Sequence, residues 1–232
     1  MMGDVGRQCV ALLDQQLGPD YISGEQEFRA LVDQPGWRLY VHEQVEPAGR
    51  DSGSVIHSAT SVEDLPAIDI AGFFVVGTVD QDELRRQTCI DGICRALPYD
   101  ADEFPVTLLK MKVVRPSWEG RGVGWRLGVA ALEHYGDAGP YVGTLLDRAT
   151  DDREGHIQNL EKIGGRAVHR FEHANPPGYR CASCGLDAEC RCDLLLYVVD
   201  GATPDPDRQP STAGPHATES HGSVGTTVVK EP

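Results

Sequence analysis

Residues 106–127 read VTLLKMKVVRPSWEGRGVGWRL, and this stretch decides the fold. Its first part, Val106–Val114, is rich in β-branched and apolar residues and predicts a strand. A loop with a proline follows, and then Gly122 and Gly124 open a run of apolar residues at helical spacing, which predicts a helix over Arg121–Tyr135. Backbone N–H groups at a helix N-terminus bind anions, and glycine lets a ligand approach them closely. The strand, turn and helix therefore predict a site for an anionic ligand.

The glycine turn is also compatible with a dinucleotide-binding fold or with a turn that binds no ligand. A dinucleotide-binding fold has G-x-G-x-x-G directly after a strand, with an acidic residue about 20 positions on. Asp147 fits that acidic position, but Leu127 stands at the third glycine, and more than a hundred residues precede the turn. An ordinary α/β turn without a ligand needs none of these features, so both alternatives stay open.

The stretch also resembles the acyl-CoA motif of the GNAT superfamily of N-acyltransferases, Arg/Gln-x-x-Gly-x-Gly/Ala after a valine-rich strand. Gly122 and Gly124 match its glycines, whereas Glu119 stands where the family has Arg or Gln. Residues 160–166, LEKIGGR, resemble a second family segment, Tyr-Glu-Lys-Leu-Gly-Phe. Leu160 occupies the position of the Tyr that usually protonates the departing thiolate. The resemblance covers residues 106–199.

The resemblance implies an α/β fold with a mixed central sheet flanked by helices, and transfer of an acetyl group from acetyl-CoA to a small-molecule or protein amine. Pantetheine would pair with the backbone of Met111–Val114, so Val113 and Val114 are expected at the cosubstrate. Backbone N–H groups of that splayed strand would polarise the thioester carbonyl. The pyrophosphate would lie on the turn, at Arg121, Gly122, Val123, Gly124, Trp125 and Arg126.

Three side chains are candidates for the proton transfer that an attacking amine requires. Glu103 lies just before the strand, Glu119 lies just after it, and His156 lies one turn before Leu160 in a helix predicted over Asp151–Ile163. Solvated surface roles for the carboxylates and a structural role for His156 remain alternatives. Because Leu160 lacks a hydroxyl group, a non-catalytic acyl-CoA-binding domain is the alternative to an enzyme, and a zinc-knuckle interaction module is a further one.

Four of the seven cysteines lie within twelve residues, at Cys181, Cys184, Cys190 and Cys192. Four thiolates can form a closed tetrahedral zinc site, which is structural because no position stays open for water. We expect this zinc-knuckle loop, residues 175–193, between the last two strands, Arg166–His173 and Leu194–Val199. Redox-active or disulfide-linked thiols, free thiols and an iron–sulfur cluster are alternatives, and His169 or His173 could replace one ligand.

The remaining patterns predict further elements on both sides of the central stretch. Helices are expected at Val5–Leu17, at Glu25–Asp33 and, with Asp80 as N-cap, through Arg86. Strands are expected at Val55-Ile56, Ile70–Val79, Tyr141–Leu146 and around residues 37–42, the last with Trp37, Leu39 and Val41 buried and Arg38, Tyr40 and His42 outside. Gly164-Gly165 should cap the helix predicted over Asp151–Ile163, and residues 89–97 show no clear pattern.

Residues 1–200 are expected to form one domain, with the four-cysteine loop inside it. Residues 201–232 contain five prolines and no Leu, Ile, Phe, Tyr, Trp, Met or Cys, so we expect a disordered acidic tail.

Composition excludes several kinds of partner. The chain has 232 residues and a formal net charge of −15, which argues against nucleic-acid and anionic-membrane binding and favours cationic amines by steering. The 17 arginines against four lysines fit either a high-salt cytoplasm or a GC-rich genome. No signal-peptide pattern or apolar run of about 18–20 residues occurs, and the cysteine number is odd, so we expect a cytoplasmic protein with reduced thiols.

Overall fold

The computed structural model describes residues 4–44, 55–136, 139–147, 161, 164–173, 175, 178–182 and 184–199. Seven strands lie in this part of the chain: β1 (Trp37–Glu43), β2 (Ile56–Ala59), β3 (Ile70–Val79), β4 (Val106–Val114), β5 (Tyr141–Asp147), β6 (Gly165–Phe171) and β7 (Asp193–Val199). The α-helices are α1 (Val5–Gln16), α2 (Glu25–Val32), α3 (Gln81–Thr88), α4 (Ile93–Ala96) and α5 (Val123–Tyr135). Short 3₁₀ turns are η1 (Val62–Asp64), η2 (Ala101–Glu103) and η3 (Pro116–Trp118).

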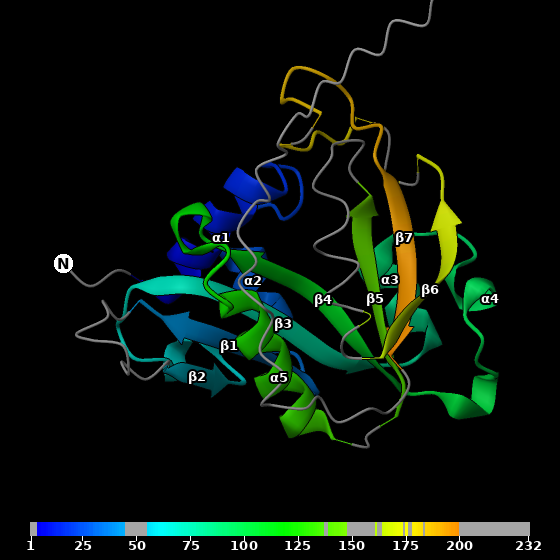
Figure 1. Ribbon diagram of the computed structural model, residues 1–232, viewed down its shortest axis with the longest axis horizontal. Helices are drawn as coiled ribbons and strands as arrows, with labels where there is room; N and C mark the ends of the chain where they lie inside the picture. Colours follow the sequence, from blue (N-terminus) through cyan, green and yellow to red (C-terminus); the bar gives the residue numbers. More distant parts are fainter. Residues whose placement is uncertain are drawn as a thin grey trace, which may run out of the picture.

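All seven strands form one sheet in the order β2-β1-β3-β4-β5-β7-β6 (Figure 1). The β4–β5 pair is parallel, and the other neighbouring strands run antiparallel. The mixed sheet with flanking helices is therefore confirmed, and it fits the GNAT fold that the resemblance implies. The four cysteines lie between β6 and β7, as expected.

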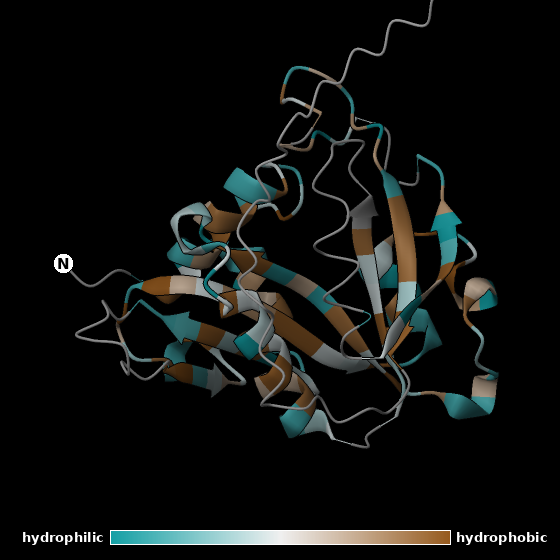
Figure 2. Ribbon diagram, in the orientation of Figure 1, coloured by the Kyte–Doolittle hydropathy of each residue, from teal (hydrophilic) through white to brown (hydrophobic). Residues whose placement is uncertain are grey.

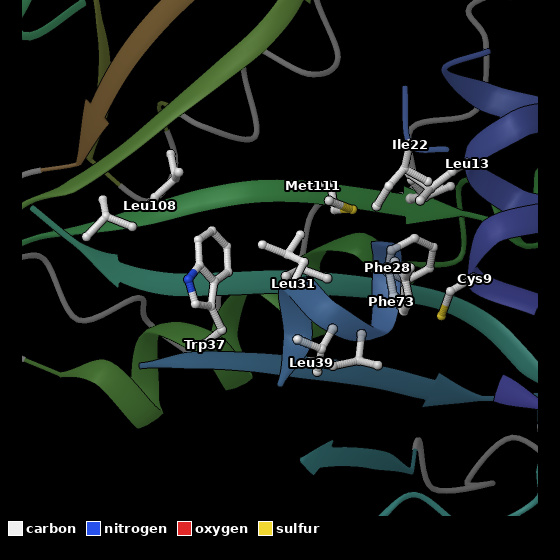
Figure 3. Packing of buried hydrophobic residues seen from close by; sticks show 14 of the residues in the cluster. Cys9, Leu13, Ile22, Phe28, Leu31, Trp37, Leu39, Phe73, Leu108 and Met111 are labelled. Atoms are coloured by element: carbon white, nitrogen blue, oxygen red, sulfur yellow. The ribbon is translucent and has the colours of Figure 1, made fainter. Parts of the chain in front are cut away.

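The two faces of the sheet carry separate hydrophobic clusters. On one face α1 and α2 pack against β1, β3 and β4, and the ring of Phe28 meets the ring of Phe73 edge-on at 5.8 Å (Figure 3). On the other face α5 packs across β1, β3 and β4, with Leu127 and Ala131 fully buried. Figure 2 shows the hydrophobic residues gathered on the strands between these layers. None of the helices in the described part combines the length and apolar character needed to cross a membrane.

Local signals set most element ends. Asp4 caps α1 by accepting from the backbone N–H of Arg7 at 3.2 Å, and Asp80 caps α3 by accepting from that of Glu83 at 2.8 Å, as predicted for Asp80. Helix α3 runs two residues past Arg86, because Cys89 in the left-handed conformation ends it.

Several expectations were wrong in detail. Strand β1 is buried on both faces, including Tyr40 and His42, because it lies between β2 and β3 and α5 covers its second side. Gly165 is the buried first residue of β6 and not part of a helix cap, and β6 ends at Phe171. Residues 89–97, for which the sequence shows no clear pattern, contain α4. The expected helix over Asp151–Ile163, except Glu161, and the expected tail over residues 201–232 lie outside the described residues.

Candidate functional site

Strands β4 and β5 separate and form a wedge within the sheet. They pair at three positions, from Thr107–Tyr141 to Leu109–Gly143, although β4 continues to Val114 and β5 to Asp147. In the same region β4 stays paired with β3, and β5 stays paired with β7 along its whole length. Among the described residues, no strand pairs with the facing backbone edges beyond Leu109, so an extended ligand with amide groups can pair with them as a strand would. Figure 1 shows the two strands diverging.

A β-bulge lies where the wedge begins. Met111 pairs with Val75 and Leu109 pairs with Val76, so Lys110 is the extra residue on β4. A bulge re-aims the neighbouring groups and leaves the extra residue outside the ladder. The carbonyl oxygen of Lys110 accepts a hydrogen bond from the hydroxyl group of Tyr21 at 3.3 Å, which ties the bulge to the segment between α1 and α2.

The glycine turn follows the C-terminal end of β4, at the open end of the wedge. Gly122 has φ +74° and precedes α5 without a side-chain cap, so the first N–H groups of the helix have no cap from that residue. Among the described residues, a Cβ atom on Gly124 would meet Val114 Cγ2 at 3.5 Å and Lys112 Cε at 3.9 Å, both ordinary contacts. Internal packing therefore does not require a glycine at position 124, whereas close approach of a phosphate group to the backbone does.

The two arginines of the turn have different surroundings. Arg121 is exposed, and its guanidinium group stacks on Trp118 at 5.0 Å from the ring centroid. Arg126 is half-buried and donates to the carbonyl oxygen of Arg121 at 2.9 Å, and burial lowers its pKa. Arg126 thus braces the turn, and Arg121 is the better placed of the two to contact a phosphate group.

His42 is a residue of this site that the sequence did not reveal. It is 3% exposed on β1, and its Nδ1 lies 2.9 Å from the carbonyl oxygen of Glu43. Its Nε2 lies 3.4 Å from Nε of Arg126, and burial lowers the pKa of the imidazole. A neutral ring that donates through Nδ1 and accepts through Nε2 satisfies both contacts.

The predicted site residues differ in where the structure places them relative to the wedge. Val113 and Val114 end β4 at the open side of the wedge, next to the turn that carries the predicted residues 121–126. Glu119 is exposed directly after η3, close to that turn in the chain. Glu103 lies before the opposite end of β4, and its carboxylate accepts from the backbone N–H of Asp100 at 2.7 Å, which is a capping role. His156 and Leu160 lie outside the described residues.

The four cysteines converge on one point. Their sulfur atoms all lie within 4.8 Å of one another; Sγ of Cys192 is 3.7 Å from that of Cys181 and 3.5 Å from that of Cys184. A tetrahedral zinc site with Zn–S bonds near 2.3 Å has sulfur atoms about 3.8 Å apart, whereas a disulfide bond needs about 2.05 Å. The arrangement fits a metal site and not a disulfide, and all four residues carry free thiols.

Polar groups around the cluster point at the sulfur atoms. Backbone N–H groups of Cys184, Arg191 and Cys192 donate to sulfur atoms at 3.3–3.4 Å, and the Asn175 amide donates to Cys190 at 3.3 Å. Such donors stabilise thiolates, and outer hydrogen bonds of this kind orient metal ligands. His169 and His173 are not part of the cluster in the described residues.

The cysteine loop is anchored to the segment between α1 and α2. Arg180 forms a two-bond ion pair with Asp20 at 2.8 and 3.0 Å, and the Tyr179 hydroxyl group donates to the carbonyl oxygen of Leu17 at 3.0 Å. Gly18 permits this contact, because a Cβ atom there would lie 2.2 Å from the carbonyl oxygen of Arg180. The loop, which connects β6 to β7, thus contacts the segment between α1 and α2.

Comparison with known proteins gives likenesses of structure. No family model matches the chain, and no curated protein matches it. Similar solved structures include Arabidopsis thaliana NAA60 in complex with acetyl-CoA (13% identity, TM-score 0.47, covering 75% of this chain and 82% of that one). The ribosomal-protein-S18-alanine N-acetyltransferase from Escherichia coli (13% identity, TM-score 0.46, 87% and 92% covered) is another.

A third similar structure is a putative acetyltransferase of the GNAT family from Desulfovibrio desulfuricans (12% identity, TM-score 0.46, 85% and 92% covered). At these identities, with TM-scores below 0.5, the likenesses carry no conclusion about the function of this chain.

Proposed function

We propose that this chain transfers an acetyl group from acetyl-CoA to an amine. The observation that carries the proposal is the wedge between β4 and β5, with a glycine turn and an uncapped helix N-terminus at its open end. An extended amide chain that ends in phosphate groups matches both features, since the wedge offers backbone partners and the turn offers anion-binding N–H groups. Pantetheine linked to a pyrophosphate has that chemistry.

Each part of the site has a role in this proposal. The backbone of Met111–Val114 pairs with pantetheine, and residues 121–126 hold the pyrophosphate, with Arg121 as its charged partner. Backbone N–H groups at the bulge polarise the thioester carbonyl. Glu119 stays the exposed candidate nearest to the turn for moving a proton, and His156 stays a sequence-based candidate. The position of Glu103 favours the capping role over a catalytic one.

We also propose that the four cysteines bind one structural zinc ion. Two observations support this proposal: the distances from one sulfur atom to another, and the backbone N–H groups that donate to the sulfur atoms. Zinc would supply folding energy to a loop that has little hydrophobic core of its own, and it would offset the cost of burying thiolates. Through the Asp20–Arg180 pair, the metal site would hold the segment between α1 and α2 beside the wedge.

The acceptor amine approaches from that α1–α2 side in this proposal, because α5 and the phosphate-binding turn occupy the other face. The net charge of −15 favours cationic acceptors by steering, and it does not support a nucleic-acid partner. A cytoplasmic location, suggested by the reduced thiols, remains part of the same proposal.

Native mass spectrometry of the full chain with and without acetyl-CoA is the deciding experiment. We expect one acetyl-CoA and one zinc ion per chain. Arg121→Glu should weaken binding roughly 10- to 100-fold, because it replaces a charge-assisted contact by repulsion. Arg95→Glu on α4 is the matched control and should bind as the wild type does. Equal affinity in Arg121→Glu would contradict the turn as the phosphate site.

A second assay separates the enzyme from a non-catalytic binding protein. Continued release of free CoA thiol, many equivalents per chain, in the presence of an amine from a panel is expected for the enzyme. Binding of acetyl-CoA without such release indicates a non-catalytic acyl-CoA-binding domain. No binding of acetyl-CoA by a zinc-loaded chain would favour an interaction module built on this fold.

A further inference from the structure

Lys110 is the extra residue of the β4 bulge, and its side chain is half-buried beside the wedge. Its Nζ lies 5.6 Å from the ring centroid of Tyr21 and donates to the carbonyl oxygen of Gln87 in the last turn of α3. Three neighbouring groups raise the pKa of Lys110 by their charge, namely Cys89, which follows α3, Glu27 on α2 and Glu83 on α3. The amine thus lies on the face of the sheet that α1 and α2 cover, between Tyr21 and the last turn of α3.

Two neighbouring lysines of β4 point to opposite faces. Lys112 Nζ lies 5.6 Å from the ring centroid of Phe74, which belongs to the cluster under α5, whereas Lys110 lies at Tyr21 on the other face. Lys110 is also the first residue of β4 beyond the last β4–β5 pair, Leu109–Gly143. Its amine therefore lies on the face from which an acceptor must approach, at the closed end of the wedge.

We propose that Lys110 is itself an acyl acceptor, so that the chain acetylates its own bulge lysine. The step starts from the neutral amine, which attacks the thioester carbonyl carbon of acetyl-CoA. A C–N bond forms, the C–S bond breaks, and CoA leaves as a thiolate that takes up the proton lost by nitrogen. This inference rests on the proposed function, because it needs acetyl-CoA bound in the wedge.

The surroundings of Lys110 favour both the reactant and the product of this step. Burial lowers the pKa of Lys110 to about 8. At pH 7.5 about a quarter of such amines are neutral, against roughly one in a thousand for an ordinary lysine. The acetylated side chain is an uncharged amide, so the burial that opposes the ammonium ion does not oppose the product. The Gln87 carbonyl can accept from the amide N–H as it does from the amine.

The contacts also allow a structural role alone, in which Lys110 caps the C-terminal end of α3 as an ammonium ion. In that case the amine would stay charged at neutral pH and would not acquire an acyl group faster than other lysines. The two roles therefore differ in a measurable way.

The test is incubation of the full chain with isotope-labelled acetyl-CoA at pH 7.5, followed by intact-mass measurement and peptide mapping. We expect one labelled acetyl group per chain, on Lys110, at an initial rate per chain that does not change with protein concentration. Lys110→Arg should abolish this label, and the control Lys230→Arg, at a lysine outside the proposed cosubstrate site, should keep it. The wild-type peptide map decides the question even if Lys110→Arg fails to fold.

Four outcomes overturn the inference. Label spread equally over the other lysines shows unselective chemistry, and a rate that rises in proportion to protein concentration shows acetylation between chains. A chain that binds acetyl-CoA in native mass spectrometry but leaves Lys110 unlabelled overturns this inference and leaves the proposed function intact. Failure to bind acetyl-CoA overturns both.

Discussion

The hydroxyl group of Tyr21 donates a hydrogen bond to the carbonyl oxygen of Lys110 at 3.3 Å, and the ring of Tyr21 packs against the four-cysteine cluster. One side chain thereby joins the cysteine loop, the segment between α1 and α2, and the bulge at the closed end of the wedge. Burial raises the pKa of Tyr21 to about 12, so the hydroxyl group remains a donor at neutral pH. The proposed acceptor side of the site and the proposed metal site thus share a structural element.

Tyr21→Phe removes that hydrogen bond and keeps the ring. We expect the free energy of unfolding to fall by about 1 kcal/mol, as for a typical buried hydrogen bond, in urea titrations followed by circular dichroism. Acetyl-CoA binding should stay unchanged while the rate of acetyl transfer falls, because the bulge loses its support. Tyr135→Phe is the control: its hydroxyl group donates to Gly36 and Val76, so stability should fall and the transfer rate should not. Equal transfer rates in both variants would contradict a role for Tyr21 at the bulge.

Gly124→Ala separates the phosphate-binding role of the turn from helix stability. Alanine stabilises a helix interior by about 0.5–1 kcal/mol relative to glycine, and a Cβ atom at position 124 meets no close contact. We expect the variant to be as stable as the wild type or more so, but to bind acetyl-CoA at least several-fold more weakly in calorimetric titrations. Gly128→Ala, in the same helix with nothing within 4 Å of the added atom, should show the same stability and unchanged binding. Unchanged binding in both variants would argue against a phosphate group at this backbone.

Cys184→Ser tests the proposed zinc site. We expect the zinc content, measured by elemental mass spectrometry, to fall from one ion per chain to near zero, with a loss of stability on the order of several kcal/mol. Acetyl-CoA affinity should change little, whereas the KM for the amine should rise, because the loop is held to the segment between α1 and α2. Cys89→Ser changes an exposed cysteine outside the cluster and should keep the zinc. A wild-type chain that binds no zinc under reducing conditions would overturn the assignment.

The parts of the site that are local in sequence were predictable, and the parts assembled across the sheet were not. Strand β4, the glycine turn and α5 follow one another within 30 residues. The spacing of their apolar residues and their glycines was therefore enough to predict all three elements. The cysteine cluster was predictable for the same reason, because its ligands lie close together in the chain. His42 could not be found, since its alternation in β1 predicted an exposed side chain, whereas α5, some 80 residues further on, covers it.

The bulge at Lys110 and the docking of the cysteine loop depend on contacts that no local pattern encodes. The bulge arises from the pairing of β4 with β3, about 35 residues earlier, and nothing in the run VTLLKMKVV distinguishes Lys110 from Lys112. The Asp20–Arg180 pair joins residues 160 positions apart. Both features are properties of the assembled sheet.

Lys110→Met changes how stability depends on pH. The folded-state pKa of Lys110, about 8, lies below the unfolded value of about 10.4, so between these values the unfolded chain binds more protons than the folded chain. This lysine therefore opposes folding fully below pH 8, and its cost declines as the pH rises toward 10. From pH 7.5 to 9.5, the stability of the wild type relative to Lys110→Met should increase by on the order of 1 kcal/mol, reduced from the full shift because the side chain is partly exposed.

The measurement compares urea unfolding of the two proteins at both pH values, using chains whose intact mass shows no acetyl group. Both proteins should carry Cys89→Ser, which removes the thiol whose charge acts on Lys110. The hydroxyl of Tyr21 then contributes equally to both and cancels in the difference. A pH-independent difference in stability between the two proteins, with and without Lys110→Met, would mean that the amine keeps an ordinary pKa in the folded chain, and it would remove the chemical basis for self-acetylation at the bulge.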